Sequence, residues 1–499
     1  MIRERLVAIL RPFGQEHLLT FWDKLDLAGQ ESLARQIEAI DFALVRRLYD
    51  GRNEHGNLRE LAARAAPPPA FRLDTAKNPF SSQQAQQRAV ESLRAGQVGV
   101  VLVAGGQGTR LGFDHPKGMF PIGPISNKTL FQIHVEKIVA ASRRYGVRIP
   151  LYLMTSPATH DETVAFFAAH ERFGLAAEDL FVFCQGTMPA VDAQSGRVLL
   201  EEPGRIATSP DGHGGMLAAM LRSGALENLE RRGIRHLFYF QVDNPLVDIC
   251  GQEFLGYHLL ANSELSSQVI AKRDPMERVG NVVQVDGRMM VIEYSDLPDD
   301  AANRRNADGS LVIWAGSIAV HVIDASLLRR TANGVPLLRR SSADRNLAPG
   351  TACKQAVAHG GEKCGPTLSG LPFHIAKKKV ACIDASGNRI EPKQPNAIKF
   401  ERFIFDLMPQ ARNAIVVEVE PAMAFAPLKN ASGAKEDTPE SVRSQLSALH
   451  RGWLRQAGAE VADEVAVEIS PLDALDAEEL KPNVRPGMKI VKPTYLGNF

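Results

Sequence analysis

The sequence predicts an α/β fold with a central, mostly parallel sheet, a helical region before it and a small domain after it. Runs that are almost entirely apolar alternate with helical stretches along the middle of the chain. Because such runs are apolar on both faces, they suit strands that are covered by helices on both sides. A chain of 499 residues also exceeds one ordinary core, so several domains are expected. The predicted strands are residues 98–104, 151–154, 180–183 and 237–242.

The N-terminal part is predicted to be helical. Residues 1–65 carry apolar positions at helical spacing, for example Leu6 and Ile9. The sequence Ala-Pro-Pro-Pro-Ala at 66–70 cannot continue a helix, because proline lacks the backbone donor and restricts the residue before it. We therefore expect a helical N-terminal region at 1–80 and a central α/β domain at 81–410.

Antiparallel strands are expected after the parallel part of the sheet. Asp286-Gly287 separates two apolar runs at 282–285 and 289–292, which is a strong signal for a two-residue hairpin. Residues 331–370 are rich in Gly, Ser, Arg and Ala without periodicity, and we expect an irregular excursion there. A strand-like run at 414–419 then opens what we interpret as a C-terminal α+β domain, residues 411–499.

The composition favours a small-molecule substrate and a reducing compartment. The 58 Lys and Arg residues balance 57 Asp and Glu residues, so no excess charge favours nucleic acid or an anionic membrane. The N-terminus lacks the apolar core of a signal peptide, and no run is long enough to span a bilayer. The 5 cysteines show no CxxC pairing. We expect a cytoplasmic protein that binds neither nucleic acid nor membrane. Its oligomeric state is left open, and a monomer is compatible with the sequence.

A glycine-rich loop follows the first of the predicted strands. It reads Gly-Gly-Gln-Gly-Thr-Arg-Leu-Gly at 105–112, and Pro-Lys-Gly follows at 116–118. Residues without a Cβ let backbone N–H groups approach phosphate oxygens, and α/β sheets bind ligands at the carboxyl ends of their strands. A Walker loop would need Ser or Thr after Lys117, and a dinucleotide fingerprint would need Gly in place of Leu111. The cations Arg110 and Lys117 suit a reaction that expels pyrophosphate.

This loop resembles the signature of the UDP-sugar pyrophosphorylases, in particular the eukaryotic-type UDP-N-acetylglucosamine pyrophosphorylases. The resemblance implies the Rossmann-like fold of nucleotide-diphospho-sugar transferases. It also implies an enzyme that makes a UDP-sugar and pyrophosphate from UTP and a sugar 1-phosphate, N-acetylglucosamine 1-phosphate in particular. Further motifs of that family stand in the same order along most of the chain, at 14–19, 210–215, 242–244, 291–295, 427–430 and 468–472.

The resemblance assigns catalytic and nucleotide-binding roles. Arg110 and Lys117 would hold the triphosphate, and Lys429 would reach the phosphate that joins nucleotide to sugar. Asp243 would ligate Mg²⁺, a cation that takes carboxylate and phosphate oxygens. His213 stands where the family more often has Asn, and an imidazole can still donate one hydrogen bond. The implied nucleotide contacts are Ala104, Gly105, Gly106, Gly108, Thr109, Gln185, Pro210, Gly212, His213 and Asp243.

The resemblance also names sugar contacts. From the pattern alone, Glu293 would be a solvated edge residue, and Phe403 and Phe405 would be core residues of a strand. Ser317 stands where the acetylglucosamine enzymes usually carry Asn, and serine is shorter and lacks an amide. The implied sugar contacts are Gly214, Asn244, Gly280, Glu293, Tyr294, Ser317, Lys399, Phe403 and Phe405.

The expected mechanism needs no general base, since the second pKa of a sugar phosphate is about 6 and the nucleophile is already a dianion. Catalysis would consist of positioning and charge stabilisation. Two alternatives stay open: the same chemistry on glucose 1-phosphate or on several sugars, and a non-catalytic UDP-sugar-binding protein. The cations Arg110, Lys117 and Lys429 argue against the second alternative, because a binding protein needs fewer charges at the scissile phosphate.

Overall fold

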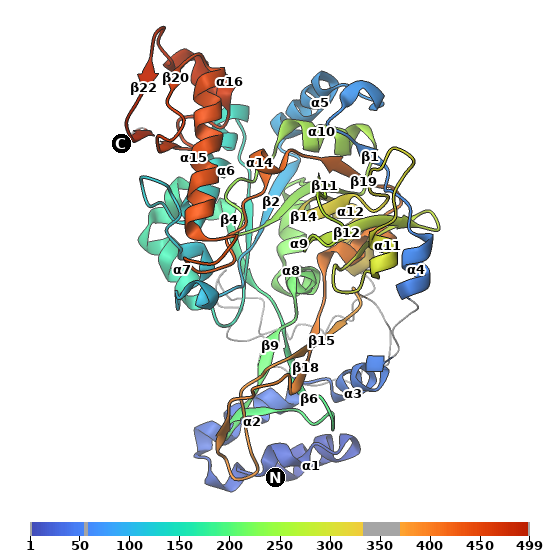
Figure 1. Ribbon diagram of the computed structural model, residues 1–499. Helices are drawn as coiled ribbons and strands as arrows, with labels where there is room; N and C mark the ends of the chain where they lie inside the picture. The colour runs from blue at the N-terminus through green and yellow to red at the C-terminus, as the bar shows by residue number, and fades with distance from the viewer. Residues whose placement is uncertain (1, 54–57, 333–369, 498–499) are drawn as a thin grey trace. The chain divides into compact units, whose positions relative to one another are not determined.

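The computed structural model describes residues 2–53, 58–332 and 370–497. The chain forms two compact units (Figure 1). The boundaries expected at residues 80 and 410 divide the chain differently and stay a prediction, and nearly all of the expected excursion at 331–370 lies outside the described residues. The first unit contains Met1–Leu58, Phe183–Ser223 and Arg330–Asp406, and the second contains Arg59–Val182, Gly224–Arg329 and Leu407–Phe499.

The second unit is built on a 10-stranded sheet with the order β1-β19-β11-β14-β10-β2-β3-β4, from which the β12–β13 hairpin extends at β14. β2 runs parallel to β10 and β3, and β19 runs parallel to β1 and β11. β14 is antiparallel to its neighbours β10 and β11. The predicted mostly parallel sheet is confirmed. The strands are β1 (Ala70–Phe71), β2 (Val98–Val103), β3 (Leu151–Thr155), β4 (Leu180–Cys184), β10 (His236–Gln241), β11 (Leu265–Ala271), β12 (Gly280–Val285), β13 (Arg288–Ile292), β14 (Ala315–Asp324) and β19 (Ala414–Glu418).

The apolar runs form strands for the predicted reason, which is burial on both faces. Val100, Val101 and Leu102 of β2 are all 0% exposed, although successive side chains of a strand point to opposite faces. The hairpin at Asp286-Gly287 is also confirmed, since β12 and β13 pair directly across it. The run at 414–419 differs from expectation: it forms β19 inside the large sheet, because it too is buried on both faces.

Helices cover the face of the sheet that carries alternate residues of β2, such as Val100 and Leu102. The covering helices contribute buried side chains to one continuous core. α5 begins with a capping box formed by Ser81 and Gln84, and α15 begins with one formed by Thr438 and Ser441. These helices are α5 (Ser82–Arg94), α6 (Leu130–Tyr145), α10 (Gln252–Leu260) and α15 (Pro439–Gln456). The other helices of this unit are α4 (Leu58–Arg64), α7 (His160–Ala169), α9 (Ala225–Arg231), α11 (Asp299–Ala302), α12 (Ala325–Ala332), α14 (Pro421–Ala424) and α16 (Ala477–Leu480).

The end of the chain adds two small parallel strand pairs beside α15, with a core of their own. Glu468 anchors this segment, because its carboxylate accepts hydrogen bonds from the backbone N–H groups of Ile125 and Ser126, both at 2.7 Å. The strands are β20 (Glu460–Val461), β21 (Val467–Ile469), β22 (Lys489–Ile490) and β23 (Thr494–Leu496).

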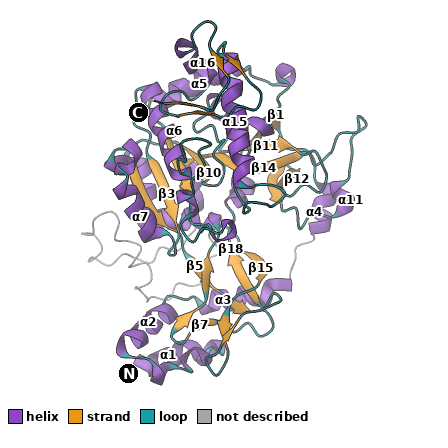
Figure 2. Ribbon diagram, turned by 60° about the vertical axis from the view of Figure 1, so that its left-hand side comes forward, coloured by secondary structure: helices purple, strands orange, loops and turns teal. Residues whose placement is uncertain are grey.

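The first unit combines the predicted N-terminal helices with short strands from later in the chain (Figure 2). The motif at 14–19 joins these parts, because the Gln15 amide accepts a hydrogen bond from Val198 N–H at 2.9 Å and donates one to the Gly196 carbonyl at 3.2 Å. A three-stranded sheet has the order β15-β18-β6. The helices are α1 (Ile2–Leu10), α2 (Leu27–Glu38), α3 (Phe42–Asp50) and α8 (Met216–Ser223). The strands are β5 (Thr187–Pro189), β6 (Val191–Asp192), β7 (Leu200–Glu202), β8 (Arg205–Ile206), β9 (Thr208–Pro210), β15 (His374–Lys378), β16 (Cys382–Ile383), β17 (Arg389–Ile390) and β18 (Ala397–Glu401).

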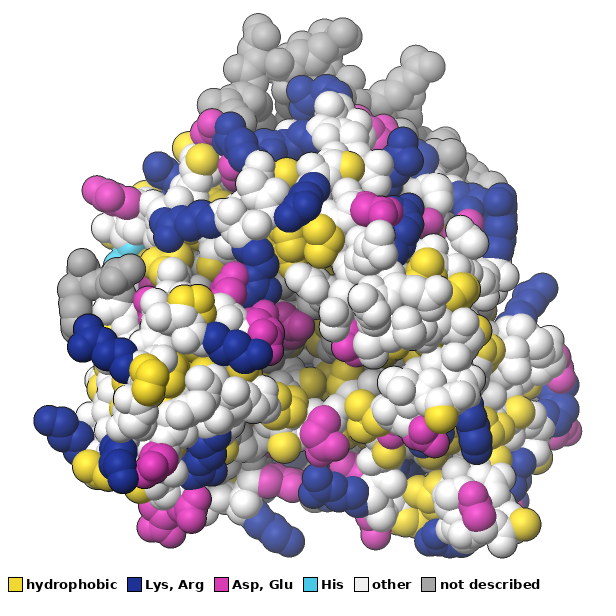
Figure 3. Space-filling model, turned by 90° about the horizontal axis from the view of Figure 1, so that it is seen from above, with side chains coloured by type: hydrophobic (Ala, Val, Ile, Leu, Met, Phe, Trp, Pro, Cys, Tyr) yellow, Lys and Arg dark blue, Asp and Glu magenta, His cyan; other side chains and the backbone are white. Residues whose placement is uncertain are grey.

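The surface reflects the balanced charge of the sequence. On the face drawn in Figure 3, basic and acidic side chains are interspersed and do not separate into patches of one sign. Within the described ranges, no helix has the length and hydropathy needed to cross a membrane.

Candidate functional site

The glycine-rich loop at 105–112 leaves the carboxyl end of β2 and folds back onto the segment that carries Lys117. Gly108 N–H donates to the carbonyl of His115 at 2.8 Å, and Lys117 N–H donates to the carbonyl of Gly106 at 3.0 Å. These two hydrogen bonds fix the spacing between the glycines and the lysine. The strand end that the sequence predicted as a ligand site therefore also positions the predicted cation.

Backbone donors in this loop are open. Gly105, Gly106 and Gln107 donate their N–H groups to no acceptor in the described part of the chain. A Cβ built on Gly106 would meet no atom within 4 Å, so the loop is uncovered at this point. Successive free N–H groups of this kind bind phosphate oxygens.

Gly118 is required by packing. A Cβ at this position would lie 2.2 Å from the ring of Phe131, so no Ser or Thr can follow Lys117 without displacing a core aromatic. The absence of Ser or Thr after Lys117, which distinguishes this loop from a Walker loop, therefore has a steric cause. It also brings the backbone after Lys117 directly onto the core.

Lys117 and Asp243 face each other, with Lys117 Nζ 3.8 Å from Asp243 Oδ2 and side chains that are 18% and 17% exposed. Lys117 Nζ donates to the carbonyl of Leu428 at 2.9 Å, and Leu428 N–H donates to the carbonyl of Asp243 at 2.8 Å. Burial lowers the pKa of Lys117, Asp243 opposes that shift, and Arg110 and Lys429 lower the pKa further. The predicted charges of the second unit therefore interact with one another.

Asp437 belongs to this cluster and was missed by the sequence analysis. Its carboxylate lies 4.0 Å from Lys429 Nζ, and its backbone carbonyl accepts hydrogen bonds from the N–H groups of Lys429 and Asn430 at 2.9 and 3.0 Å. Burial raises the pKa of Asp437, Lys429 opposes that shift, and Asp243 raises the pKa further. Its place before the N-cap Thr438 made it look like an ordinary turn residue.

Two buried side chains of α6 hold the backbone around Asp243. His134 Nε2 donates to the carbonyl of Val242 at 3.0 Å, and Lys137 Nζ donates to the carbonyls of Pro245 and Val247 at 2.7 and 2.9 Å. Residues three apart on a helix share a face, so one helix reaches both sides of the carboxylate. In the sequence, His134 and Lys137 are polar residues between apolar ones, and no motif marks them.

Asn244, predicted as a sugar contact, uses most of its amide within the protein. Its Oδ1 accepts hydrogen bonds from the N–H groups of Leu246 at 3.2 Å and Ala426 at 3.0 Å, and its Nδ2 donates to the carbonyl of Ala424 at 2.8 Å. The side chain is buried. These contacts tie the loop after Asp243 to the segment that leads to Lys429.

Three predicted sugar contacts come together where β12, β13 and β14 meet. Gly280 and Ser317 are register partners in adjacent strands. A Cβ on Gly280 would lie 2.8 Å from Val291 Cγ1, 3.7 Å from Glu293 Oε1 and 4.0 Å from Ser317 Cβ, so the glycine makes room for Val291 and lies beside two polar side chains. Glu293 is half-buried, whereas Tyr294 beside it is 47% exposed.

The surroundings of Asp243 fit a hard divalent cation. Its carboxylate accepts no hydrogen bond from the residues that the structure describes, and its ionic partner is Lys117. Asp437 adds a second carboxylate to the same electrostatic cluster. Mg²⁺ is held in proteins by one or two carboxylates together with substrate phosphates and water, so the donor set suits that ion.

In the first unit, His213 packs with the two predicted aromatics. Its ring stacks on Phe403 with centroids 5.2 Å apart, and it meets the edge of Phe405 at 5.8 Å. Ile404 N–H donates to His213 Nδ1 at 3.2 Å, so the ring proton sits on Nε2. Burial lowers the pKa of His213 to about 4, and nearby His374 adds to the shift. A neutral imidazole with one N–H donor remains.

The glycines of the motif at 210–215 are required by the packing of the chain itself. A Cβ on Gly212 would lie 2.3 Å from the carbonyl oxygen of Arg402, and one on Gly214 would lie 2.6 Å from the backbone of Phe403. Gly214 N–H also donates to the Arg402 carbonyl at 2.8 Å. The predicted ligand contacts at these glycines stay a prediction, while their immediate neighbour is the backbone that follows β18.

Asp211 is a second residue that the sequence analysis missed. Its side chain is 5% exposed, and Oδ1 has no hydrogen-bond partner in the described structure. A Cβ on Gly215 would lie 2.0 Å from that oxygen, so the glycine makes room for the carboxylate. Burial raises the pKa of Asp211, and Arg222 and Arg402 oppose that shift.

The other predicted contacts of the first unit lie on its strands. Gln185 is buried next to Gly186, whose carbonyl accepts a hydrogen bond from Asp211 N–H at 3.0 Å. Pro210 pairs with Thr187 at the ends of β9 and β5. Lys399 lies in the middle of β18. The predicted residues therefore fall into two groups, one in each unit.

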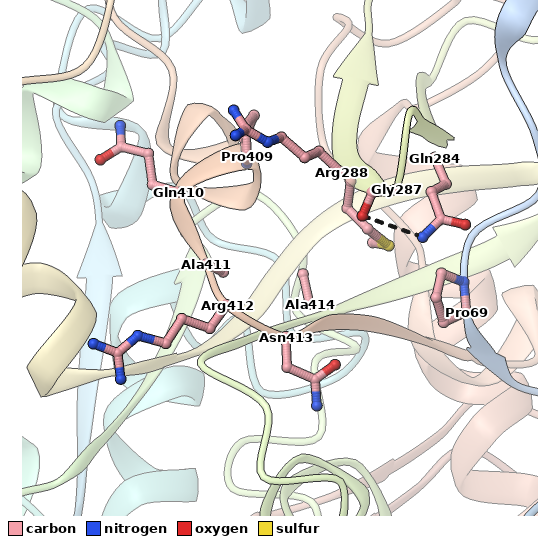
Figure 4. A pocket seen from close by; sticks show the side chains of 11 residues that line it. Pro69, Gln284, Gly287, Arg288, Pro409, Gln410, Ala411, Arg412, Asn413 and Ala414 are labelled. Atoms are coloured by element: carbon pink, nitrogen blue, oxygen red, sulfur yellow. Dashed lines mark hydrogen bonds between the residues drawn. The ribbon is translucent and has the colours of Figure 1, made fainter.

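A separate cavity of about 520 Å³ opens in the second unit where the β12–β13 turn approaches the start of β19 (Figure 4). Arg288 and Arg412 lie at its rim, and none of the predicted site residues lines it. Asn413 points its amide toward the carbonyl of Ala261, to which it donates at 2.7 Å. The cavity is therefore distinct from the glycine-rich loop and from the charges around Lys117.

Comparison with known proteins gives consistent matches. The family model described as UTP–glucose-1-phosphate uridylyltransferase matches residues 47–326. UDP-N-acetylglucosamine pyrophosphorylase of Saccharomyces cerevisiae is 34% identical over 92% of this chain and 92% of its own length. Human UDP-N-acetylhexosamine pyrophosphorylase-like protein 1 is 34% identical over 94% of this chain and 88% of its own length.

A solved structure extends the similarity to the fold. The uridine diphosphate N-acetylglucosamine pyrophosphorylase of Trypanosoma brucei, crystallised with an inhibitor, superposes with a TM-score of 0.75 at 25% sequence identity. The match covers 99% of this chain and 98% of that one. The similarity therefore includes both compact units.

Proposed function

The chain belongs to the UTP–glucose-1-phosphate uridylyltransferase family, and on that premise we propose that it joins UTP to N-acetylglucosamine 1-phosphate and releases pyrophosphate. The family and the relatives make the chain a uridylyltransferase. The choice of sugar rests on the names of the relatives, which are UDP-N-acetylglucosamine and UDP-N-acetylhexosamine pyrophosphorylases. The observation that carries the chemistry is the open glycine-rich loop beside the partly buried Lys117.

The proposed reaction is one in-line displacement. A phosphate oxygen of the sugar 1-phosphate attacks the α-phosphorus of UTP, a new P–O bond forms, and the bond to the β-phosphate oxygen breaks. Pyrophosphate leaves with the electron pair of that bond. The attacking phosphate is already ionised, because its second pKa is about 6, so no proton has to be removed. The protein contributes positioning and charge.

The position of each charged residue around Lys117 suggests which phosphate it binds. The open N–H groups of 105–107 and the side chains of Arg110 and Lys117 bind the β- and γ-phosphates, where negative charge accumulates as pyrophosphate departs. Lys429 binds the α-phosphate and the sugar phosphate. Asp437 holds Lys429 by ion pairing and by its backbone carbonyl, so it acts as a positioning residue.

Mg²⁺ is the proposed metal, and Asp243 would hold it with Asp437 nearby. When bound, the ion would neutralise phosphate charge at the reacting centre. His134 and Lys137 keep the carboxylate in place through the backbone on either side of it. The partial neutralisation of Lys117 by Asp243 would end once the metal occupied that carboxylate, which would free the lysine for phosphate.

The first unit is proposed to contribute contacts to the base and ribose. His213 Nε2–H can donate to a uracil carbonyl, and its neutral state at physiological pH follows from the lowered pKa of about 4. Gln185 and Pro210 are the other proposed base contacts, and Lys399, Phe403 and Phe405 are proposed to enclose the sugar.

A second candidate substrate, glucose 1-phosphate, is favoured by one observation. Ser317 is the register partner of Gly280, and its hydroxyl is shorter than the amide usual in the acetylglucosamine enzymes. We also propose a cytoplasmic location, since a reducing compartment suits Cys250 and Cys382, which are free thiols in the described part of the chain.

The test is pyrophosphate release with UTP and Mg²⁺ across a panel of sugar 1-phosphates. We expect the highest kcat/KM with N-acetylglucosamine 1-phosphate. A higher value with glucose 1-phosphate would overturn the proposed sugar. Tight binding of UDP-sugars without release of pyrophosphate from any substrate would indicate a binding protein and overturn the proposed activity. Omission of divalent metal should abolish turnover if the metal assignment holds.

A further inference from the structure

Three side chains that can ligate a metal converge at one end of two central strands, opposite the end at which the glycine-rich loop lies. His236 begins β10, Asp324 ends β14, and the two are direct partners across these antiparallel strands. His258 comes from α10, which covers the sheet. His236 Nδ1 lies 2.6 Å and His258 Nε2 lies 3.1 Å from the same oxygen, Asp324 Oδ1. All the ligand atoms lie within 4.8 Å of one another.

We propose that His236, His258 and Asp324 bind a divalent transition-metal ion, with Zn²⁺ as the best-suited ion. Two imidazole nitrogens and one carboxylate oxygen form a ligand set that suits Zn²⁺ and its neighbours in the first transition row. Mg²⁺ and Ca²⁺ prefer sites made of oxygen ligands, so this site would not compete for the ion at Asp243.

The distances are close to those of a tetrahedral site. Bonds of about 2.0–2.1 Å from a tetrahedral ion place its ligand atoms about 3.4 Å apart. The separation of 3.1 Å between His258 Nε2 and Asp324 Oδ1 is near that value. The separation of 2.6 Å between His236 Nδ1 and the same oxygen needs to increase by less than about 1 Å, which a rotation of the His236 ring supplies.

The burial of the three side chains leaves room for a fourth ligand from solvent. The His258 side chain is 1% exposed, whereas the side chains of His236 and Asp324 are 13% and 24% exposed. The ion would therefore be held against the sheet on one side, with water completing its coordination on the other. Such an ion would join β10, β14 and α10, so its expected effect is stabilisation of the second unit.

Metal binding requires the proton of each imidazole ring to move to the other ring nitrogen. In the metal-free arrangement, His236 Nδ1 and His258 Nε2 donate their protons to Asp324. On metal binding each ring presents a lone pair at that nitrogen and carries its proton on the other one. His258 Nδ1 lies 2.9 Å from Ser266 Oγ, which can then accept the hydrogen bond. A second hydrogen bond of this kind is usual for metal-bound histidine. No oxidation and no net release of protons are required of neutral rings.

The experiment uses the untagged full-length protein, stripped with a chelator and titrated with Co²⁺. Tetrahedral Co²⁺ absorbs visible light much more strongly than octahedral Co²⁺, so the spectrum distinguishes the proposed site from an oxygen site at Asp243. We expect one equivalent of strongly absorbing Co²⁺ that Zn²⁺ displaces and excess Mg²⁺ does not. Asp324→Asn and His258→Gln should each weaken Co²⁺ binding by at least about tenfold, and Asp243→Asn should keep the signal.

Three results would overturn the proposal. The first is a weak, octahedral spectrum at one equivalent of Co²⁺. The second is an unchanged titration in folded Asp324→Asn or His258→Gln protein, with folding checked by circular dichroism. The third applies even if both variants fail to fold: crystals of the unmodified protein grown with Co²⁺ would show the anomalous signal away from these residues. Pyrophosphate release plays no part in these readouts, so failure here is independent of the proposed activity.

Discussion

At the scale of single residues, Lys117 and Lys429 are paired only loosely with the carboxylates beside them. Lys117 lies 3.8 Å from Asp243, and Lys429 lies 4.0 Å from Asp437. Both separations are at the outer limit of an ion pair and longer than a hydrogen bond. The cations are therefore held in position while their donors stay available, which is what a site for transferred phosphate requires.

The first prediction concerns Lys117. Lys117→Ala should lower kcat for pyrophosphate release by about 10²–10³-fold, because a charge aimed at developing negative charge stabilises the transition state more than the bound substrate. The far-UV circular dichroism spectrum should not change. Lys435→Ala serves as the control, because it removes an exposed lysine from the loop between Lys429 and Asp437, and it should leave kcat unaltered. Near-normal turnover of Lys117→Ala would show that the loop is assigned wrongly.

The second prediction concerns Ser317, whose Oγ accepts a hydrogen bond from Ala319 N–H at 3.3 Å. Ser317→Asn should raise the ratio of kcat/KM for N-acetylglucosamine 1-phosphate over glucose 1-phosphate by about tenfold, as one added hydrogen bond near 1.4 kcal/mol would do. Both substrates are assayed with the same preparation, so the ratio is independent of the active fraction. A ratio that stays constant or falls, with both substrates turned over, would mean that Ser317 does not face the 2-substituent.

At the scale of elements, the site depends on buried polar side chains that hold loops by their backbones. α6 supplies His134 and Lys137 to the loop around Asp243, and Asn244 ties that loop to the segment that carries Lys429. A loop held through its carbonyl and N–H groups keeps one conformation without using the side chains that meet the substrate. Positioning and chemistry are therefore carried by different residues.

The third prediction tests this division at Asn244. Asn244→Ala would leave the N–H groups of Leu246 and Ala426 and the carbonyl of Ala424 without partners. The expected loss in the free energy of unfolding is about 1–3 kcal/mol for each group that stays buried and unpaired. Chemical denaturation measures this loss, and kcat should fall because Lys429 loses its support.

Asn244→Asp is the matched variant for this test. It keeps both acceptor interactions with N–H groups but sets a buried carboxylate oxygen against the Ala424 carbonyl, so it should be less stable than the wild type at neutral pH and regain stability on acidification, when the protonated acid can donate to that carbonyl. If Asn244→Ala had unaltered stability but a raised KM for the sugar 1-phosphate, the residue would be a sugar contact, as the family resemblance implies, and not a structural tie.

At the scale of the whole molecule, local patterns predicted the fold better than they predicted its assembly. The strand at 98–104, the glycine-rich loop after it and the hairpin at Asp286-Gly287 depend on neighbouring residues and could be predicted. The run at 414–419 was assigned to a separate domain, because sequence spacing does not show that a late strand pairs beside β11. The first unit combines distant segments for the same reason.

The site shows the same limit. The glycines, cations and Asp243 carry motifs, so they could be proposed from the sequence. The environments of Asp211 and Asp437 depend on burial and on residues that are distant in the sequence, such as Arg402 near Asp211. No local pattern marks these carboxylates. The glycines at 212 and 214 carried a motif, and the structure adds a second reason for them, since they accommodate the backbone of the chain itself; their ligand contacts stay a prediction.

The last prediction concerns acid stability of the second unit. Burial lowers the pKa of His134 and of His450 to about 3 from the usual value of 6.5, and nearby Lys137 lowers both further. The folded state therefore keeps both rings neutral, while the unfolded chain takes up protons once the pH falls below 6.5. Each histidine makes the free energy of unfolding fall by about 1.4 kcal/mol per pH unit between 6.5 and about 3, and has no such effect above 6.5.

Denaturant unfolding of the wild type and His134→Gln at about pH 7 and about pH 5 measures this effect. Glutamine can still donate a hydrogen bond toward the Val242 carbonyl, but it does not titrate. Carboxylates that titrate in this range contribute equally to both proteins and cancel in the difference. The variant should therefore lose less stability on acidification than the wild type, by about 1.4 kcal/mol for each pH unit below the pKa of the unfolded histidine. Equal losses in the two proteins would mean that His134 takes up a proton as readily in the folded state as in the unfolded chain, which would contradict its burial as a neutral ring.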